Sequence, residues 1–337
     1  MAKILIIRLT SLGDVIFTFP LVHYLKKNGF DVDFLVSEKG YSIVKTNPDI
    51  SKTILLPILK WKREGFKFGE FKNIISNLRK ENYDIALDCQ QMFKSILPFM
   101  LCKAKRRITF SDARELSKFA GNEFVKPKTK FRDYNYHMVE RNLDFARYLG
   151  LNIDKIEFPA PNIDNDTKTK ADELLKDIDT SKKTVVISPE TTWDNKHWSI
   201  ENWQEVIENL KDRVNILFTG TNQKLISKFS EYGIDLSGKT NLIELLEIFK
   251  RADLVISPDS GSSNLAWYSS VPSIITIFTC TPSKKFGPYG NDKKYFSIQG
   301  NLKCQPCFKK KCINKTMRCV KTPAPDEIIK IVNEILF

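Results

Sequence analysis

The sequence predicts an α/β protein made of two doubly wound domains. Three observations predict this fold class. Short Ile-, Leu- and Val-rich runs of the buried-strand type alternate with helix-like stretches, which is typical of βαβ units and a parallel sheet. This alternation stops in a polar, Asp-rich stretch and then starts again. At 337 residues, the chain is also about twice as long as a typical single domain.

The first half contains strand and helix signals in regular succession. The apolar run at 3–9 predicts a strand, and the polar turn at 10–14 follows it. A helix-like stretch then ends at Asn28 and Gly29, a typical helix stop. Further strands are expected at 32–36, 83–88 and 107–110, and further helices at 70–82 and 138–149.

The second half repeats the pattern after a linker, which we expect over residues 150–183. Strands are expected at 184–188, 214–219, 254–257 and 273–278, and helices at 200–211, 223–232 and 242–251. We therefore place an N-terminal domain at 1–160, a C-terminal domain at 161–322 and a last helix at 323–337. The cleft between two such domains is the expected ligand site.

Composition excludes several classes of protein and suggests an anionic partner. With 42% hydrophobic and 28% charged residues, the chain is neither disordered, collagen-like nor a coiled coil. Its net charge of +13 is uneven, because residues 1–150 carry +11, residues 151–300 carry −3 and residues 301–337 carry +5. A basic first half favours an anionic partner, and the alternative is a lysine-rich surface that is only solvated.

No segment approaches the roughly 18 to 20 uninterrupted apolar residues of a membrane span. At the N-terminus, Arg8 and Asp14 interrupt the apolar run, so no signal peptide is expected. Seven cysteines, an odd number, fit reduced thiols better than a disulfide framework. We therefore expect a cytoplasmic protein.

The first chemical motif is the turn RLTSLGD at 8–14, directly after the first expected strand. A carboxylate there can take a proton from a hydroxyl nucleophile, which makes Asp14 a candidate general base. Gly13 would let a substrate approach the backbone closely. The alternative is an acidic residue that only stabilises a helix N-terminus.

The second motif is SPETTWDNKHW at 188–198, again directly after a strand. Thr191 and Thr192 offer hydroxyl and backbone donors, and Lys196 offers a positive charge suited to a phosphate. His197 and Trp198 can equally be packing residues, so we assign no role to His197.

The third motif is SPDSGSSNLAW at 257–267. Asp259, Ser260 and Gly261 stand at the start of an expected helix, whose free N–H groups suit an anion such as a diphosphate. The alternative is an ordinary Asp/Ser helix cap. The sequence contains neither the dinucleotide-binding nor the P-loop fingerprint.

Four cysteines lie close together near the C-terminus, beside three consecutive lysines. They are Cys304, Cys307, Cys312 and Cys319. Their spacing differs from the usual paired C-x2-C knuckles, and the lysines would favour thiolates without a metal. We predict no metal at these cysteines, and the alternative is a tetrahedral site for zinc or another metal.

Taken in order, several segments of this chain resemble glycosyltransferase family 9, the ADP-heptose:lipopolysaccharide heptosyltransferases. The resemblance covers nearly the whole chain, and no single motif would suffice. The segments are KILIIRLTSLGDVIFTFPLV, YDIALDCQQMFKS and AKRRITF in the first half, then DNKHWSIENW, the stretch from DLSGKTNL to SGSSNLA, GPYG at 287–290 and CQPCFKKKC.

The resemblance implies a GT-B architecture, with the acceptor bound by the first domain and the nucleotide-sugar by the second. It also implies an inverting, metal-independent transfer that needs no cofactor, with an ADP-sugar as donor substrate. Asp14 would be the general base, and Thr10, Ser11 and Gly13 would form the acceptor loop. The donor-binding residues would be Thr191, Thr192, Lys196, Asp259, Ser260, Gly261 and Asn264.

Two departures from the family pattern lie in the donor domain. Asn264 stands where the family usually has histidine, and residues 278–281 read FTCT in place of FGPT. The family's acidic residue that contacts the ribose has no clear counterpart; Asn222 and Gln223 are nearest, and we assign neither. An alternative is therefore a family member that uses another nucleotide-sugar for a capsule or other surface glycan.

The resemblance also implies the partners. We expect transfer of heptose from ADP-heptose to a lipopolysaccharide inner-core acceptor, an anionic lipid-linked glycan. The basic face of residues 1–150 would then contact the anionic inner face of the cytoplasmic membrane. No nucleic-acid partner is expected, because the basic half lacks a nucleic-acid-binding motif. By resemblance to GT-B enzymes, the C-terminal helix is expected to pack back on the first domain.

Overall fold

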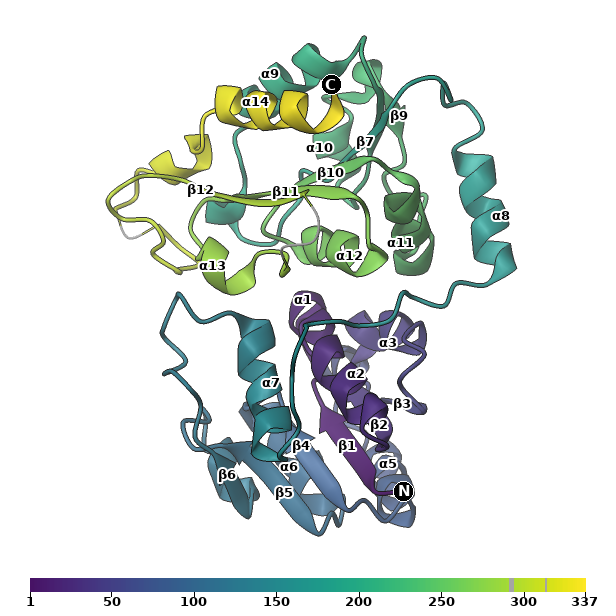
Figure 1. Cartoon of the computed structure of the whole chain (residues 1–337), viewed down its shortest axis with the longest axis vertical. Coiled ribbons are helices and arrows are strands. Elements are labelled where there is room, and N and C mark those ends of the chain that lie inside the picture. The colour runs from purple at the N-terminus through teal and green to yellow at the C-terminus, as the bar shows by residue number, and fades with distance from the viewer. Residues whose placement is uncertain (291–293, 313) are drawn as a thin grey trace. The chain divides into compact units, whose positions relative to one another are not determined.

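Each half of the chain forms a parallel sheet with helices packed against it (Figure 1). The computed structural model describes residues 1–290, 294–312 and 314–337. The chain divides into two units, Met1–Asn162 and Ile163–Phe337. Within the described residues each unit has six strands, and every pair of neighbouring strands is parallel.

The first sheet has the strand order β3-β2-β1-β4-β5-β6. The strands are β1 (Lys3–Ile7), β2 (Asp31–Val36), β3 (Lys52–Leu55), β4 (Ile85–Asp88), β5 (Arg106–Phe110) and β6 (Glu123–Val125). Because the order reverses between β1 and β4, the crossover connections diverge there and leave a crevice at the carboxyl ends of these strands. Ile7 and Asp88 pair across this point.

Helices pack against this sheet in two groups. The first unit contains α1 (Leu12–Ile16), α2 (Phe19–Lys27), α3 (Glu38–Lys45), α4 (Ile58–Glu64), α5 (Phe68–Lys80), α6 (Phe93–Leu101), the 3₁₀ helix η1 (Ser117–Ala120) and α7 (Met138–Tyr148). Phe71 of α5, Phe99 of α6 and Ala120 of η1 join one hydrophobic cluster with Leu5 and Ile7 of β1. α2 and α7 pack against each other (Figure 1).

The second sheet repeats the topology of the first, in the order β12-β11-β10-β7-β8-β9. Its strands are β7 (Thr184–Ile187), β8 (Asn215–Phe218), β9 (Ile234–Asp235), β10 (Leu254–Pro258), β11 (Ser273–Phe278) and β12 (Lys294–Gln299). The order reverses between β7 and β10, so the crevice of this unit lies at their carboxyl ends.

Helices of the second unit include α9, whose residues Trp203, Val206 and Ile207 pack into the core against the sheet. Trp198 is buried against Trp203, with ring centroids 5.0 Å apart, so its role is packing. The helices are α8 (Asn165–Leu174), η2 (Asp194–Lys196), α9 (Ile200–Leu210), α10 (Gln223–Ile226), η3 (Ser230–Tyr232), α11 (Leu242–Arg251), α12 (Gly261–Ser269), α13 (Ser283–Phe286), η4 (Arg318–Lys321) and α14 (Pro325–Leu336).

Two expected elements differ from the structure. The expected linker at 150–183 contains helix α8, because the Asp164 carboxylate accepts a hydrogen bond from Thr167 N at 2.7 Å and Ala171 is buried, in a helix that packs against α11. The expected helix at 223–232 is broken into α10 and η3, because only Ile226 and Phe229 bury large apolar side chains there. The short strands β3, β6, β9 and β12 were not expected, because their sequences show no clear hydrophobic periodicity.

The C-terminal helix α14 packs against α9 (Figure 1). Ile328 and Val332, both buried, belong to the hydrophobic core of the second unit. The apolar face of this helix is therefore used within the second unit. In the part of the chain that is described, no helix has the length and apolarity to cross a bilayer.

Candidate functional site

The loop after β1 is fastened to the loop after β4 at the crevice of the first unit. The side-chain oxygen of Gln90 accepts hydrogen bonds from the backbone N–H groups of Leu9 and Thr10, both at 2.9 Å. The Lys94 amine contacts the Thr10 hydroxyl. Ser11 in this loop is exposed, and Gly13 is buried in α1. The loop predicted to receive the acceptor thus has a fixed backbone beside the strand ends.

Asp14 lies in the first turn of α1, with a cation on one side and the loop on the other. Its Oδ1 is 2.7 Å from Nη2 of Arg8, and its Oδ2 accepts hydrogen bonds from Ser11 N at 3.1 Å and Ser11 Oγ at 3.0 Å. Burial alone would raise the pKa of Asp14, but the Arg8 charge and the Ser11 donors outweigh it, so the pKa lies below its usual value. The carboxylate is ionised at neutral pH, and 28% of the side chain remains exposed to a substrate.

Arg8 is the residue in this half that sequence reasoning missed. It is a buried arginine whose guanidinium connects Asp14 to the carbonyl of Cys89. A buried charge is stable only when it is paired, and Asp14 provides that pair. The available signal was a basic residue placed directly at the end of an otherwise apolar strand.

Two more cations, Lys94 and Arg114, interact with the charge of this acid. Burial and the charge of Arg8 lower the pKa values of Lys94 and Arg114, while the negative charges of Asp14 and Glu115 oppose that effect. Arg141, which is buried and paired with an Asp112 carboxylate oxygen at 2.5 Å, also lowers the pKa of Arg114 through its charge. Around Asp14, the cations Arg8, Lys94 and Arg114 thus outnumber the acids Asp14 and Glu115, which suits an acceptor that carries acidic groups.

A second carboxylate, Asp88, lies fully buried at the end of β4. It accepts hydrogen bonds from Gln90 N at 3.1 Å, Gln91 N at 3.0 Å and Ser95 Oγ at 3.1 Å. Burial raises the pKa of Asp88 to about 6, because these donors and the nearby Arg8 charge offset the loss of water only in part. Asp88 therefore fastens the loop that holds Arg8 and Thr10.

In the second unit, the loops after β7 and β10 meet around one acid. The Lys196 amine lies 2.6 Å from Oδ2 of Asp259, and the Thr281 hydroxyl donates to the same oxygen at 2.6 Å. The Thr191 hydroxyl donates to the backbone carbonyl of Asp259 at 3.4 Å. Three predicted donor-binding residues are thus brought together, whereas Thr192 is exposed beside them.

Helix α12 starts at this place. The Ser260 hydroxyl caps it by accepting a hydrogen bond from Ser262 N at 3.2 Å, and Gly261 is its first residue. Asn264 donates from its amide nitrogen to the Ser260 carbonyl at 2.8 Å. Its oxygen is buried without a hydrogen-bond partner among the described residues. The crevice therefore combines a positive helix end and a lysine with an unused acceptor, a set that suits a phosphorylated, hydroxyl-bearing ligand.

Glu190 is the acidic residue in this half that sequence reasoning missed. Its carboxylate accepts hydrogen bonds from the Thr221 hydroxyl at 2.8 Å and from Asn222 N at 3.1 Å. Although burial opposes it, these donors together with Thr221 N hold the pKa of Glu190 below its usual value. Asn222 caps α10 through Leu225 N at 3.1 Å, so its side chain is already engaged. Glu190 thus supplies a negative charge beside the loop after β8.

The four clustered cysteines differ in exposure. Cys304 is exposed, Cys307 and Cys312 are partly buried, and Cys319 is buried. Hydrogen bonds from backbone amides lower the pKa of the Cys312 thiol, and the amide of Met317 has the largest effect. Burial raises the pKa of Cys319, and the neighbouring thiols add to this. Across the described residues, no group of three or more His, Cys, Asp or Glu side chains is arranged to hold a metal ion.

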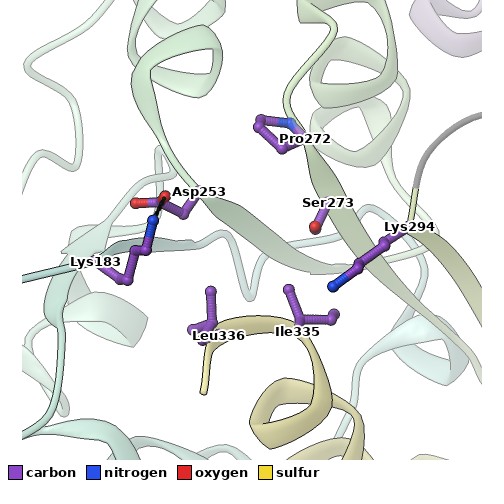
Figure 2. A pocket seen from close by; sticks show the side chains of 7 residues that line it. All are labelled: Lys183, Asp253, Pro272, Ser273, Lys294, Ile335 and Leu336. Atoms are coloured by element: carbon purple, nitrogen blue, oxygen red, sulfur yellow. Dashed lines mark hydrogen bonds and ion pairs between the residues drawn. The ribbon is translucent and has the colours of Figure 1, made fainter.

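A pocket of about 450 Å³ lies at the end of the second sheet where the strands begin, opposite to the crevice with Lys196 (Figure 2). It is lined at the amino ends of the strands by Lys183, Asp253, Ser273 and Lys294, and by Ile335 and Leu336 of α14. Lys183 and Asp253 form an ion pair at 2.9 Å. Because ligands of doubly wound sheets bind at the carboxyl ends of the strands, and no predicted site residue lines this pocket, it is not the candidate site.

The geometry can be compared with known proteins. The sequence profile described as "Glycosyltransferase family 9 (heptosyltransferase)" matches residues 72–318. The chain belongs to glycosyltransferase family 9. It is therefore a glycosyltransferase, and its two Rossmann-like units form the GT-B fold.

Relatives of this family 9 enzyme match it over nearly its full length. Lipopolysaccharide heptosyltransferase 1 of Campylobacter coli is 28% identical, with 99% of this chain and 98% of that protein aligned. The structure of Escherichia coli heptosyltransferase WaaC with ADP has a TM-score of 0.77 at 22% identity, covering 98% of this chain and 99% of that one. A family 9 transferase from Veillonella parvula has a TM-score of 0.84 at 17% identity, covering 99% and 97%. At these identities the solved structures show the shared fold.

The first prediction concerns the buried Asp88 of this transferase. Because its pKa is raised in the folded state, the stability that its protonation provides is fully present below its ordinary pKa near 4 and is lost as the pH rises through about 6. Between pH 4 and pH 7.5 the wild type should therefore lose on the order of 2–3 kcal/mol of unfolding free energy relative to Asp88→Asn. Urea denaturation at a series of pH values measures this difference.

Asp84→Asn is the matched control, because the contribution of Asp84 to stability should change with pH in the opposite direction. Hydrogen bonds from Lys105 and from the Lys3 backbone lower the pKa of Asp84, so its stabilising contribution is present at neutral pH and is lost as the pH falls. A difference between wild type and Asp88→Asn that did not change with pH would contradict the assignment of a raised pKa.

Proposed function

We propose that this chain transfers heptose from ADP-heptose to a lipopolysaccharide inner-core acceptor, with inversion at the anomeric carbon and without a metal ion or other cofactor. The observation that carries the proposal is the Asp14 carboxylate, ionised and partly exposed among cations at the end of β1. The substrate class is taken from related lipopolysaccharide heptosyltransferases, whose sequence match spans both units of this chain.

Asp14 would act as the general base. Arg8 and Ser11 occupy three of the roughly four hydrogen-bonding directions of its carboxylate, which leaves one for an acceptor hydroxyl. As the hydroxyl oxygen attacks the anomeric carbon, its proton moves to Asp14 and the bond to the diphosphate breaks. Because its pKa is low, Asp14 is a weaker base. Arg8 and Ser11 compensate for this weakness by holding the carboxylate in one orientation toward the acceptor hydroxyl.

The charge on the leaving ADP would be stabilised in the second unit. Lys196, Thr191 and Thr192 would hold the diphosphate together with the start of α12 at Asp259, Ser260 and Gly261. Lys196 is paired with Asp259 at 2.6 Å. The ammonium group has three N–H donors, so it can keep one contact with Asp259 and give others to phosphate oxygens.

We also propose that the enzyme works in the cytoplasm, in peripheral contact with the inner face of the cytoplasmic membrane. The supporting observation is the charge of residues 1–150, which carry 27 basic and 16 acidic side chains. Binding one small donor does not require this charge, whereas a lipid-linked acceptor with acidic groups at an anionic bilayer favours it. An expected consequence is that membrane association weakens as the salt concentration rises.

Replacement of Asp14 tests the mechanism. Asp14→Asn keeps the shape of the side chain and removes the base, so its kcat should be about 10²–10⁴-fold lower than that of wild type. The kcat of Asp14→Ala should be reduced at least as much. ADP affinity should change by less than about twofold, because the residues proposed to bind ADP lie in the other unit. Steady-state kinetics and calorimetric titration of ADP measure the two effects, with Asp49→Asn, an acid paired with His23, as the control. Near-normal turnover of Asp14→Asn would show that another group is the base.

Replacement of Lys196 tests the diphosphate site. Lys196→Ala should weaken ADP binding by about 10–100-fold, because it removes a charge-assisted hydrogen bond and leaves Asp259 unpaired beside the phosphates. Lys196→Arg keeps the charge and should recover part of the affinity. If ADP bound equally well to all three proteins, the diphosphate would have to lie elsewhere.

The alternative function is transfer of another sugar nucleotide to a capsule or other surface glycan, and Asn264 is the residue that favours it. A donor that binds the folded chain raises its melting temperature by mass action, by an amount equivalent to about 2.7 kcal/mol at a hundredfold excess over Kd. ADP-heptose should therefore stabilise the protein more than UDP-, GDP- or dTDP-hexoses at the same concentration. A larger shift with one of those hexoses would favour the alternative.

A further inference from the structure

Helix α6 has two apolar faces, and only one of them is covered. Ser95, Pro98 and Phe99 are buried, and Phe99 packs into the hydrophobic cluster under the helix. On the other side, Phe93, Leu97 and Met100 are exposed by 72%, 53% and 49%. Their spacing of four and three residues places these three side chains on one side of the helix. A helix of this kind has an apolar face that still lacks a partner.

The 3₁₀ helix η1 and the residue before it extend this exposed face. Leu116 and Phe119 are exposed by 66% and 71%. Helices α6 and η1 contact each other, and Ala120 of η1 packs into the same cluster as Phe99 of α6. Both helices therefore belong to one layer on one face of the first sheet. We call the exposed side chains of this layer the α6–η1 surface: Phe93, Leu97, Met100, Leu116 and Phe119.

The segment that carries the α6–η1 surface is rich in positive charge. Residues 93–132 contain eleven basic and three acidic side chains. Among them Lys103 and Lys118 are exposed, and the Lys118 amine lies 5.1 Å from the centroid of the Phe119 ring. Aromatic and aliphatic side chains mixed with lysines are typical of surfaces that enter the interfacial region of an anionic membrane. The cores of protein–protein interfaces, in contrast, are depleted in lysine.

We infer that the α6–η1 surface is the place where this chain docks on an anionic lipid bilayer. Phe93, Leu97 and Phe119 would enter the headgroup region, while Lys103 and Lys118 would contact lipid phosphates. The inference rests on the proposed function in one respect, since that function calls for a lipid-linked acceptor.

The surface adjoins the acceptor loop of the same unit. Phe93 is followed by Lys94, whose amine contacts the Thr10 hydroxyl. The Phe93 backbone N–H donates to a Glu115 carboxylate oxygen at 2.9 Å, which joins the start of α6 to the segment before η1. An acceptor sugar anchored in the bilayer would therefore meet Asp14 close to where the membrane holds the enzyme, and its lipid chains need not leave the bilayer.

The test is binding of the full chain to sedimented vesicles. Wild type should bind vesicles of phosphatidylglycerol and phosphatidylethanolamine, and bind phosphatidylcholine vesicles at least about tenfold more weakly. The triple variant Phe93→Ser/Leu97→Ser/Phe119→Ser should lose at least about tenfold in binding to the anionic vesicles. Lys103→Gln/Lys118→Gln should lose about fivefold per lysine at low salt and less at high salt. Tyr148→Ser, 42% exposed on α7, is the matched control and should bind like wild type.

Several outcomes would overturn the inference. Equal binding of wild type and the triple variant to anionic vesicles would do so, as would a failure of wild type to bind them. If light scattering showed that wild type is an oligomer and the triple variant a monomer, a second copy of the chain would be what covers the surface. Turnover on a water-soluble acceptor without lipid chains should be the same in both proteins, and a selective loss in the triple variant would place these residues in the acceptor site.

The same experiments separate this inference from the proposed function. If no nucleotide-sugar supports transfer by wild type, the proposed function fails. The vesicle comparison still decides whether the α6–η1 surface binds the bilayer, because it needs no turnover. ADP binding and thermal unfolding of the triple variant check that its fold is intact.

Discussion

The reversal of strand order within each parallel sheet is the constraint on which both halves of this molecule depend. Right-handed crossovers run away from β1 and β4 in one sheet, and from β7 and β10 in the other. No helix can cover the carboxyl ends of the strands at these points, so the loops that follow them are free to carry polar groups. The loops with Asp14 and Cys89 stand at the first point, and the loops with Lys196 and Asp259 stand at the second.

At both points an acid and a cation neutralise each other at short distance. The Arg8–Asp14 pair is formed within one turn, and the Lys196–Asp259 pair joins two loops that are far apart in the sequence. Poorly hydrated charges are costly unless paired, so each pair fixes the local backbone as well as its own side chains. The same pairing sets their chemistry, because Arg8 keeps Asp14 ionised and Asp259 keeps Lys196 in place for an anion. Structure and reactivity therefore depend on the same contacts.

Much of the fold was predictable, because buried strands and amphipathic helices leave periodic patterns in the sequence. The central strands β1, β4, β7, β10 and β11 were all expected near their observed positions. The linker was not, since α8 is a polar helix that depends on the Asp164 cap and on packing against α11. The C-terminal helix was predicted as amphipathic, but which core its apolar face would enter depends on long-range packing that the pattern does not encode.

The sequence by itself determined the family, the α/β class and the motifs that contain Asp14, Lys196 and Asp259, because these are local patterns of residue type and spacing. Tertiary structure decided which groups those residues meet. Arg8 became the partner of Asp14, Asp88 became a buried acid with a raised pKa, and Glu190 came to lie beside the loop after β8. It also decided which apolar side chains stay uncovered, as Phe93 and Phe119 do. The physical reason is that charge pairing and burial depend on distances between strand ends, which hydrophobic periodicity along the chain does not specify.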